Sequence, residues 1–269
     1  FGRFDSLDPS DGAKTSRVSL SGNWRRSESN QITAVQWYAL KYDLDLFSNF
    51  TYALERPSDQ FAQTDHRTVL GGKAFRTWIT ELGSDRTMLN TAGVQLRQDD
   101  IRVVLYDTAQ RQIQATVRDD QVRQTMLGVY GQNEISWNSW LRTIAGLRAD
   151  QLNVNVTSHS LSDNSGKASA FKLSPKMSFI FGPWNKTEFF LNTGKGFHSN
   201  DARGMTARVD PKTGLHIDRV PGLVSSRGQE VGVKTEVIPN LQSTLALWRL
   251  DFDSELVYVG DAGNTEAGR

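Results

Sequence analysis

A chain of 269 residues can form one large domain or two ordinary ones, and its 31 basic and 30 acidic side chains are too evenly balanced for a nucleic-acid surface. The sequence contains no cysteine, which excludes a disulfide framework and a thiolate metal site. No apolar run approaches the roughly 18 residues of a membrane helix, and the mean hydropathy is −0.48, which leaves one membrane class open, the β-barrel with alternating strands. Because the chain starts at Phe1 rather than at a methionine, we expect it to be part of a longer protein.

The first expected strands alternate apolar and polar side chains with a period of two. Residues 17–25 set Val18, Leu20 and Trp24 opposite arginine, serine and asparagine side chains. Residues 40–54 set leucine, tyrosine and phenylalanine at even positions against lysine, aspartate, asparagine and threonine at odd ones. Successive side chains of a strand point to opposite faces, so both segments predict a strand with one apolar and one polar face.

Four segments in the middle and late parts of the chain also predict strands. Residues 75–82 and 124–132 have mixed faces, whereas residues 141–150 and 230–237 alternate more cleanly. The expected strands run over roughly 10–15 residues, which exceeds the usual 5–6 of globular strands and suits the tilted strand of a membrane barrel.

The clearest alternation lies in residues 243–256. Its even positions are mostly apolar or aromatic and include Trp248, while its odd positions carry Arg249, Asp251, Asp253 and Glu255. We predict that the Trp248 face contacts lipid and that the four charges belong to the wall of a wet lumen. Carboxylates at i and i+2 of a strand are about 6.6–7 Å apart, which is too wide to share a small ion easily, so a metal site is disfavoured.

Short and long connections alternate along the chain. The short, turn-like ones are at 26–30, 81–86, 133–139, 182–186 and 237–240, and the longer polar ones are at 55–67, 97–120, 156–169 and 198–226. Outer-membrane barrels have this asymmetry, with short periplasmic turns and longer external loops. Three tryptophans lie in or beside the short turns, where a lower aromatic girdle is expected, although a hydrophobic core is an alternative place for them: Trp137, Trp140 and Trp184.

The order of segments in the last third adds a resemblance. It consists of SPK (174–176), the turn GPWNK, the strand TEFFLNTGKGF (187–197), a long loop, SSRGQEVGVKTE (225–236), the turn VIPN and the stretch 241–266. This order resembles the late part of the barrel of a TonB-dependent outer-membrane receptor, and GLRAD (146–150) resembles the end of a strand of that family.

The resemblance implies an all-β fold, in which residues 1–269 are a partial outer-membrane β-barrel domain. It would be an antiparallel transmembrane β-barrel fragment with roughly ten strands of a 22-stranded barrel, the plug missing. Such a receptor of the bacterial outer membrane imports a scarce ligand, such as a metal chelate or siderophore, with energy from the TonB system. The implied partners are outer-membrane lipid, the plug domain of the same parent chain, TonB through the missing N-terminal part, and an unidentified small molecule. Neither a cofactor, nor a nucleic acid, nor an enzymatic activity is expected.

The stretch GKGFHSNDARG, residues 194–204, is the most site-like part of the sequence. Its candidates for contact with ligand or plug are His198, Asn200, Asp201 and Arg203. A dinucleotide loop is disfavoured because the third glycine of that fingerprint would fall at Ser199 and no helix pattern follows. A metal site is disfavoured because one histidine beside one aspartate lacks further ligands. We expect this stretch to leave the barrel wall at the external end and to fold toward the lumen.

Two alternatives remain open on the sequence. A passive porin or an outer-membrane enzyme could use the same barrel, and a soluble all-β carbohydrate-binding module could also alternate polar and apolar residues. A plug domain upstream would exclude the porin and the outer-membrane enzyme, and a need for detergent would exclude the soluble module. No catalytic residue is predicted, since no serine–histidine–aspartate arrangement can be recognised without geometry. No metal ligand is predicted either.

Overall fold

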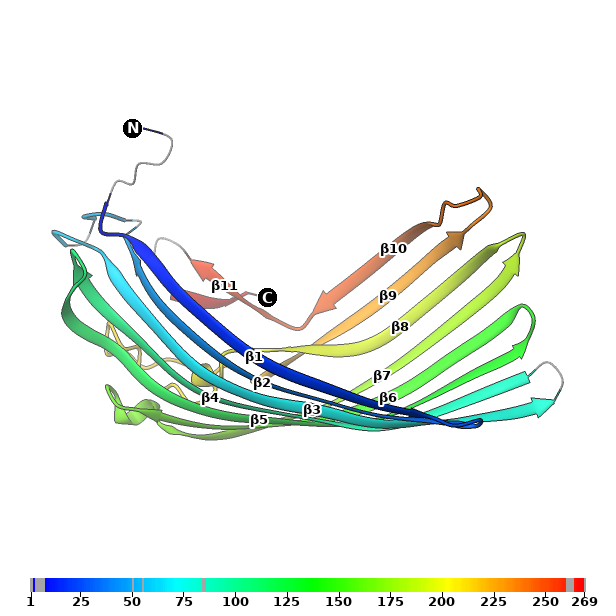
Figure 1. The fold of residues 1–269 in the computed structure, drawn as a ribbon. Helices are drawn as coiled ribbons and strands as arrows, with labels where there is room; N and C mark the ends of the chain where they lie inside the picture. Colours follow the sequence, from blue (N-terminus) through cyan, green and yellow to red (C-terminus); the bar gives the residue numbers. More distant parts are fainter. Residues whose placement is uncertain are drawn as a thin grey trace.

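The structure, a computed structural model, describes residues 2, 8–49, 51–54, 56–83, 86–259 and 264–268, with side chains in its strands described as far as residue 254. Ten strands form one antiparallel sheet in which each strand pairs with its neighbours in sequence (Figure 1). They are β1 (Gly12–Ser27), β2 (Gln31–Ser48), β3 (Phe61–Gly83), β4 (Arg86–Ala109), β5 (Gln112–Asn138), β6 (Leu141–Ser158), β7 (Gly166–Trp184), β8 (Thr187–Ser199), β9 (Leu223–Thr235) and β10 (Ser243–Phe252). A separate hairpin follows, β11 (Glu255–Val259) and β12 (Asn264–Gly268), and two short 3-10 turns are η1 (Ser162–Asn164) and η2 (Ala202–Met205).

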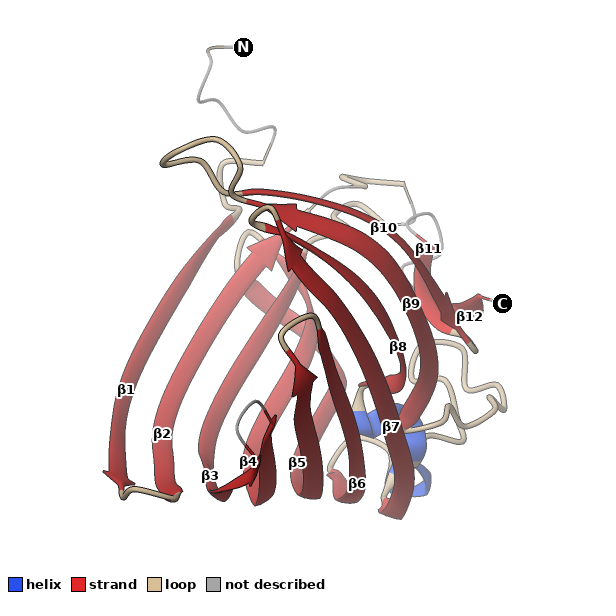
Figure 2. Ribbon diagram, turned by 90° about the vertical axis from the view of Figure 1, so that its right-hand side faces the viewer, coloured by secondary structure: helices blue, strands red, loops and turns tan. Residues whose placement is uncertain are grey.

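The sheet is strongly curved and open, like part of a barrel wall. Figure 1 shows it as a trough, and Figure 2 shows β1 and β10 at its two open edges. No described helix is long and apolar enough to cross a membrane. The prediction of roughly ten antiparallel strands is confirmed, and the strands are longer than expected, reaching 27 residues in β5.

One expected long connection is wrong. Residues 97–120 are not a loop, because β4 and β5 extend through them and meet at a tight turn of Gln110 and Arg111. Both turn residues have positive φ, 48° and 63°, as in the two-residue hairpin turns whose twist matches that of the strands. The polar residues that resemble a loop in the sequence are therefore strand residues. Some are exposed on the convex face, as Arg102 is, and others form ion pairs on the concave face, as Asp99 and Asp120 do.

The register assigns every strand residue to one of two faces, because directly paired residues point to the same side. On the convex face, the part of each strand that extends outward from the short turns is mostly apolar and exposed, with Arg76 of β3 as a charged exception. We call this surface the apolar belt, and its large exposed members are Val18, Leu20, Trp24, Val35, Trp37, Leu70, Trp78, Leu82, Val94, Leu96, Leu127, Val129, Trp137, Leu147, Phe171, Leu173, Phe189, Leu191, Val231, Leu245 and Leu247. A contiguous exposed surface of this kind matches the lipid-facing band of a barrel.

The polarity of both faces reverses toward the long-loop end. There the convex face becomes charged, as at Lys41, Asp43 and Asp45 of β2, whereas the concave face becomes apolar, as at Leu44 and Leu46 of the same strand. The strand expected over residues 40–54 ends with β2 at Ser48, and its residues 40–48 belong to a part of the wall that lies beyond the belt. The strands extend out of the apolar zone, with water outside and packed side chains inside.

The short-turn end carries an aromatic cluster. The rings of Trp140 and Trp184 stack with centroids 6.3 Å apart, and Trp184 also meets Phe189 at 6.3 Å. Trp137 ends the convex face of β5 and donates from Nε1 to Thr143 Oγ1 at 2.9 Å. All three tryptophans are partly exposed rather than in a core, which agrees with the predicted girdle.

The outer end of β8 leaves its neighbour β7. Pairing between these strands stops at Lys176 and Gly194, next to Pro175, which has no N–H to donate to the ladder. Beyond this point β8 and β9 cross the concave face of the sheet, where Lys172 Nζ of β7 donates to Ser225 Oγ of β9 at 2.6 Å. The first glycine of the GKG sequence therefore marks a branch point of the wall rather than a nucleotide loop.

The register also corrects the predicted faces of β10. Trp248 pairs with Glu230, which accepts a hydrogen bond from Asn192, so the Trp248 side chain belongs to the concave face. Arg249 and Asp251 lie on the convex face that also carries Leu245 and Leu247. They pair with each other at 3.0 Å at the outer end of the belt, and their expected place on the lumen wall is wrong.

Candidate functional site

The connection between β8 and β9 lies against the concave face. We call residues 200–222 the inner strap. Its η2 turn buries Ala202 and Met205, which pack together with Leu223 on an apolar patch of β5 and β6. The patch consists of Val122, Leu152, Val154 and Val156, each at most 4% exposed. Burial of this apolar surface holds the strap to the outer half of the inner wall.

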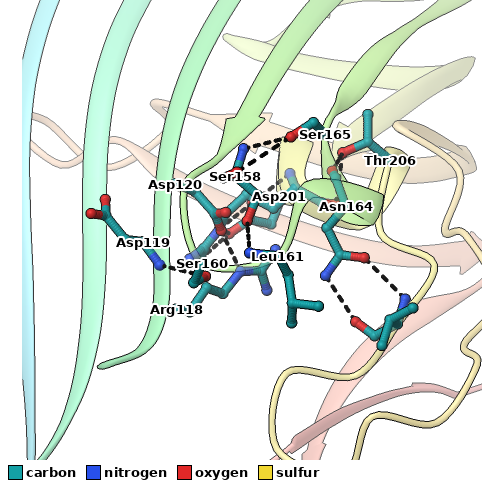
Figure 3. Close-up of polar contacts among 12 residues, drawn as sticks. Arg118, Asp119, Asp120, Ser158, Ser160, Leu161, Asn164, Ser165, Asp201 and Thr206 are labelled. Carbon is teal, nitrogen blue, oxygen red and sulfur yellow. Dashed lines mark hydrogen bonds and ion pairs between the residues drawn. The ribbon is translucent and has the colours of Figure 1, made fainter. Parts of the chain in front are cut away.

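One buried side chain clamps the strap to the β6–β7 turn. Asn164, in η1, donates from Nδ2 to the carbonyl of Val209 at 2.8 Å, and its Oδ1 accepts from the backbone N–H groups of Arg208 and Val209 at 2.8 and 3.0 Å. Thr206 Oγ1 donates to the Asn164 carbonyl at 2.9 Å (Figure 3). Asn164 is 2% exposed, so these contacts satisfy polar groups that water does not reach.

Three candidates of the site-like stretch have local partners within the strap. Asn200 Nδ2 donates to the carbonyl of Pro221 at 2.8 Å, and its backbone N–H donates to the carbonyl of Gly222, which closes the base of the loop. Asp201 caps η2 by accepting from the N–H of Arg203 at 2.9 Å, and the Arg203 guanidinium also donates to both carboxylate oxygens of Asp201.

The environment of Asp201 lowers its pKa. Burial on its own would raise this pKa, but the hydrogen bonds and positive charge of Arg203 outweigh burial and keep it below its ordinary value, with a further contribution from Arg118 of β5. The same carboxylate raises the pKa of Arg203 despite the opposing effect of burial. Both groups are therefore charged at neutral pH.

His198 is separate from the other candidates. It belongs to β8, and its ring makes an edge-on contact with Phe252 of β10, with centroids 5.4 Å apart. The structure therefore brings Asp201 and Arg203 together, places Asn200 beside them at the loop base, and sets His198 in an aromatic contact across β9. Asp253, the next expected wall charge, follows β10 and donates its backbone N–H to the Ser225 carbonyl, while the side chain of Glu255 lies outside the described residues.

Four same-strand ion pairs line the concave face of β3 to β6. Each joins an arginine and an aspartate two residues apart, and each aspartate is at most 6% exposed. The pairs are Asp65–Arg67 on β3, Arg97–Asp99 on β4, Arg118–Asp120 on β5 and Arg148–Asp150 on β6. The buried carboxylates hold the guanidinium groups in place, so the wall presents arginine donors to the interior.

The β5 pair is incompletely satisfied. Arg118 Nη2 and Asp120 Oδ1 are buried and have no hydrogen-bond partner among the described residues. They lie close to Asp201, as Figure 3 shows. No group of three or more potential metal ligands exists in the described part of the chain, so the cluster is one of paired charges and apolar anchors.

Sequence reasoning missed these wall pairs and the Asn164 clamp. A signal for the pairs was present, because an arginine and an aspartate recur at i and i+2 in nine places along the chain, at 3–5, 65–67, 97–99, 100–102, 118–120, 148–150, 201–203, 208–210 and 249–251. Asn164 gave no signal, because its partners are backbone groups more than 40 residues away.

The chain is similar in fold to several solved outer-membrane receptors. It aligns with the ferric citrate transporter FecA in its unliganded form (TM-score 0.74, 13% identity, 92% of this chain and 36% of that one). It aligns with the copper transporter OprC (TM-score 0.70, 14% identity, 96% of this chain and 42% of that one). It also aligns with the ferric-catecholate import receptor Fiu from E. coli K12 (TM-score 0.69, 11% identity, 96% of this chain and 43% of that one). The chain thus spans about two fifths of the length of these proteins.

The family comparison covers nearly the whole sequence. A model of the "TonB dependent receptor-like, beta-barrel" family matches residues 2–268. Proteins of this family are receptors and transporters of the bacterial outer membrane, and an open ten-stranded sheet with an apolar convex belt is the corresponding part of such a barrel. The chain belongs to the TonB-dependent receptor β-barrel family.

Proposed function

We propose that the chain is part of the barrel wall of an outer-membrane receptor that imports a scarce ligand, such as a metal chelate, with energy from the TonB system. The observation that carries this proposal is the apolar belt, which ends at a charged zone on strand after strand. A wall with this pattern suits a bilayer with water beyond one side of it. The family membership supports the transport of a metal or its chelate, as do the names of the ferric citrate transporter FecA, the copper transporter OprC and the ferric-catecholate import receptor Fiu.

The inner strap and the wall pairs are the proposed contact surface for the plug domain or the ligand. Asp201 and Arg203 lie near Arg118 and Asp120, so a polar group that reaches this point meets donors and acceptors of both charges. Their mutual contacts are stronger in a narrow vestibule than at a free surface, because fewer waters compete for them. We propose that this cluster positions the plug or the ligand, with Asn200 closing the strap and His198 bordering it.

The test uses the full parent protein in cells with an active proton-motive force. Uptake of radiolabelled ferric chelates is measured with and without an uncoupler, and again in cells that lack TonB. The proposal expects accumulation of at least one chelate that stops in both treatments. Uptake that is indifferent to both would support a passive channel instead.

The role of the strap is tested with an Asp201→Ala/Arg203→Ala double variant. Uptake is expected to fall several-fold while the heat-resistant mobility of the barrel on a gel stays normal. A Lys186→Ala variant, at the opposite end of the barrel, is the matched control. Normal uptake in the double variant would show that the Asp201–Arg203 pair is a solvated loop contact with no role in transport. Loss of the heat-resistant band would show that the pair stabilises the barrel itself.

A further inference from the structure

The boundary of the apolar belt can be followed residue by residue across β2 to β5. One row of paired residues on the convex face is Trp37, Gly72, Leu96 and Leu127, and the next row outward is Ala39, Leu70, Gln98 and Thr125. The two following rows are Lys41, Thr68, Asp100 and Arg123, and then Asp43, His66, Arg102 and Gln121. Successive rows are about 6.6–7 Å apart along a strand, so the surface changes from apolar to charged within the thickness of a lipid head-group layer.

A groove of about 470 Å³ crosses this boundary. Its lining includes Leu70 at the belt and then Lys41, His66 and Arg102 in the charged rows, with Asp43 and Asp100 between them. The groove thus joins an apolar floor to a set of hydrogen-bond donors. It is continuous with the surface that faces lipid in the proposed function.

The charged side chains are arranged so that the cations are the more accessible members of each ion pair. His66 is 49% exposed against 32% for Asp43, Arg102 is 56% against 18% for Asp119, and Arg123 is 65% against 42% for Asp100. Lys41 makes no ion pair within 4 Å in the described part of the chain. An approaching anion therefore meets donors first, while the carboxylates are already occupied by their partners.

We propose that this groove is a binding site for the phosphate of an anionic membrane lipid, held by Lys41 and Arg102 with His66 beside them, while the acyl chains lie on the apolar belt below. The proposal rests on the membrane position in the proposed function. The bound phosphate belongs to a lipid rather than to free phosphate, because Leu70 and the apolar belt extend from the groove in the direction that the acyl chains would take. Lysine and arginine near a membrane surface attract anionic lipids, so several such side chains in one groove give a measurable preference.

The experiment uses the full parent protein reconstituted into vesicles of equal phosphatidylglycerol and phosphatidylcholine. The protein is extracted in mild detergent, and the lipids that stay bound are counted by native mass spectrometry. The wild-type protein is expected to retain phosphatidylglycerol over phosphatidylcholine by at least fivefold. A Lys41→Gln/Arg102→Gln double variant is expected to lose that preference, whereas a Lys41→Arg/Arg102→Lys variant keeps it.

The matched control is Lys167→Gln, which removes a cation from the convex charged zone of β7 but lies outside the groove. It should retain the wild-type preference. An equal loss in this control, or no preference in the wild-type protein, would overturn the proposal. Displacement of the bound lipid by 10 mM inorganic phosphate would do so too, because it would make the groove a free-phosphate site.

Failure of this site and failure of the proposed function give different results. Lipid retention needs neither a ligand nor TonB, so a receptor that imports nothing could still keep its lipid preference. A protein that does not insert into the vesicles would instead contradict the membrane position itself. Normal heat-resistant mobility of the Lys41→Gln/Arg102→Gln variant on a gel shows that its loss of bound lipid does not result from unfolding of the barrel.

Discussion

At the scale of single residues, the position of the strap depends on Asn164. Its side chain makes three buried hydrogen bonds to Arg208 and Val209, and truncation would leave their backbone groups without partners. Buried groups left unsatisfied cost about 1–3 kcal/mol each, so Asn164→Ala should weaken strap docking by about 2–4 kcal/mol after partial rehydration. Hydrogen exchange at the amides of Arg208 and Val209 should accelerate accordingly. Asn164→Asp sets a second acceptor oxygen against the Val209 carbonyl and should not restore the protection. Equal exchange in the unaltered protein and in Asn164→Ala would contradict the clamp.

The Asp201–Arg203 contact should depend on pH in one direction. Because the pKa of Asp201 is lower in the folded chain than in the unfolded one, its contribution is fully present above the unfolded value of about 3.9 and is lost as the pH falls through the folded value. Protection of the strap amides should therefore be flat from pH 8 to pH 5 and should decline below about pH 4. Asp201→Asn should remove this acid-dependent decline. A decline centred near pH 6 would point to a histidine instead.

At the scale of elements, the strap is a docked part of the wall, and its contact with β7 can be tested by a disulfide. A Cβ atom on Gly166 would lie 3.7 Å from the Cβ of Thr206, close to the 3.8 Å average of disulfides. The chain has no cysteine, so Gly166→Cys/Thr206→Cys creates one possible bridge within it. We expect rapid, nearly complete bridging under mild oxidation, read as a shift on a non-reducing gel.

A second cysteine pair provides the control for the bridge. A Cβ atom on Gly204 would lie 3.8 Å from the Cβ of Val220, and both positions are inside the strap. Gly204→Cys/Val220→Cys should therefore bridge whether or not the strap is docked. If this pair forms its bridge and the Gly166–Thr206 pair does not, the strap is not seated on β7 as the structure has it.

At the scale of the whole molecule, the two faces of the wall should respond differently to charge. Leu247 lies on the convex belt and its neighbour Trp248 on the concave face. Leu247→Arg in the parent protein should destabilise the barrel by about 2–4 kcal/mol if the position lies near the middle of the bilayer, and Trp248→Arg should cost less because its face is wet. Unfolding in lipid vesicles measures both. A larger loss for Trp248→Arg would reverse the faces of β10.

The sequence by itself determined the strand content, the antiparallel order and the aromatic short-turn end. Period-two alternation is a local property, and the tryptophans of 137–184 lie next to turns that are short in the chain itself. The family resemblance could be stated from the order of segments in residues 174–266, and the family comparison confirms it. These features needed no knowledge of which residues meet across the fold.

Only the tertiary structure decided which face is which and where the belt ends. Alternation gives two faces but does not show which one is convex, and the apolar face changes sides beyond the belt. The apolar even positions of residues 40–48 and Trp248 therefore lie on the concave face. The charged residues 97–120 likewise belong to two long strands rather than to a loop, because the strand wall accommodates charge on both faces. Arg102 is exposed on the convex face, whereas Asp99 and Asp120 form ion pairs on the concave face. The strap, its Asn164 clamp and the buried wall aspartates depend on contacts between distant residues, which no local pattern encodes.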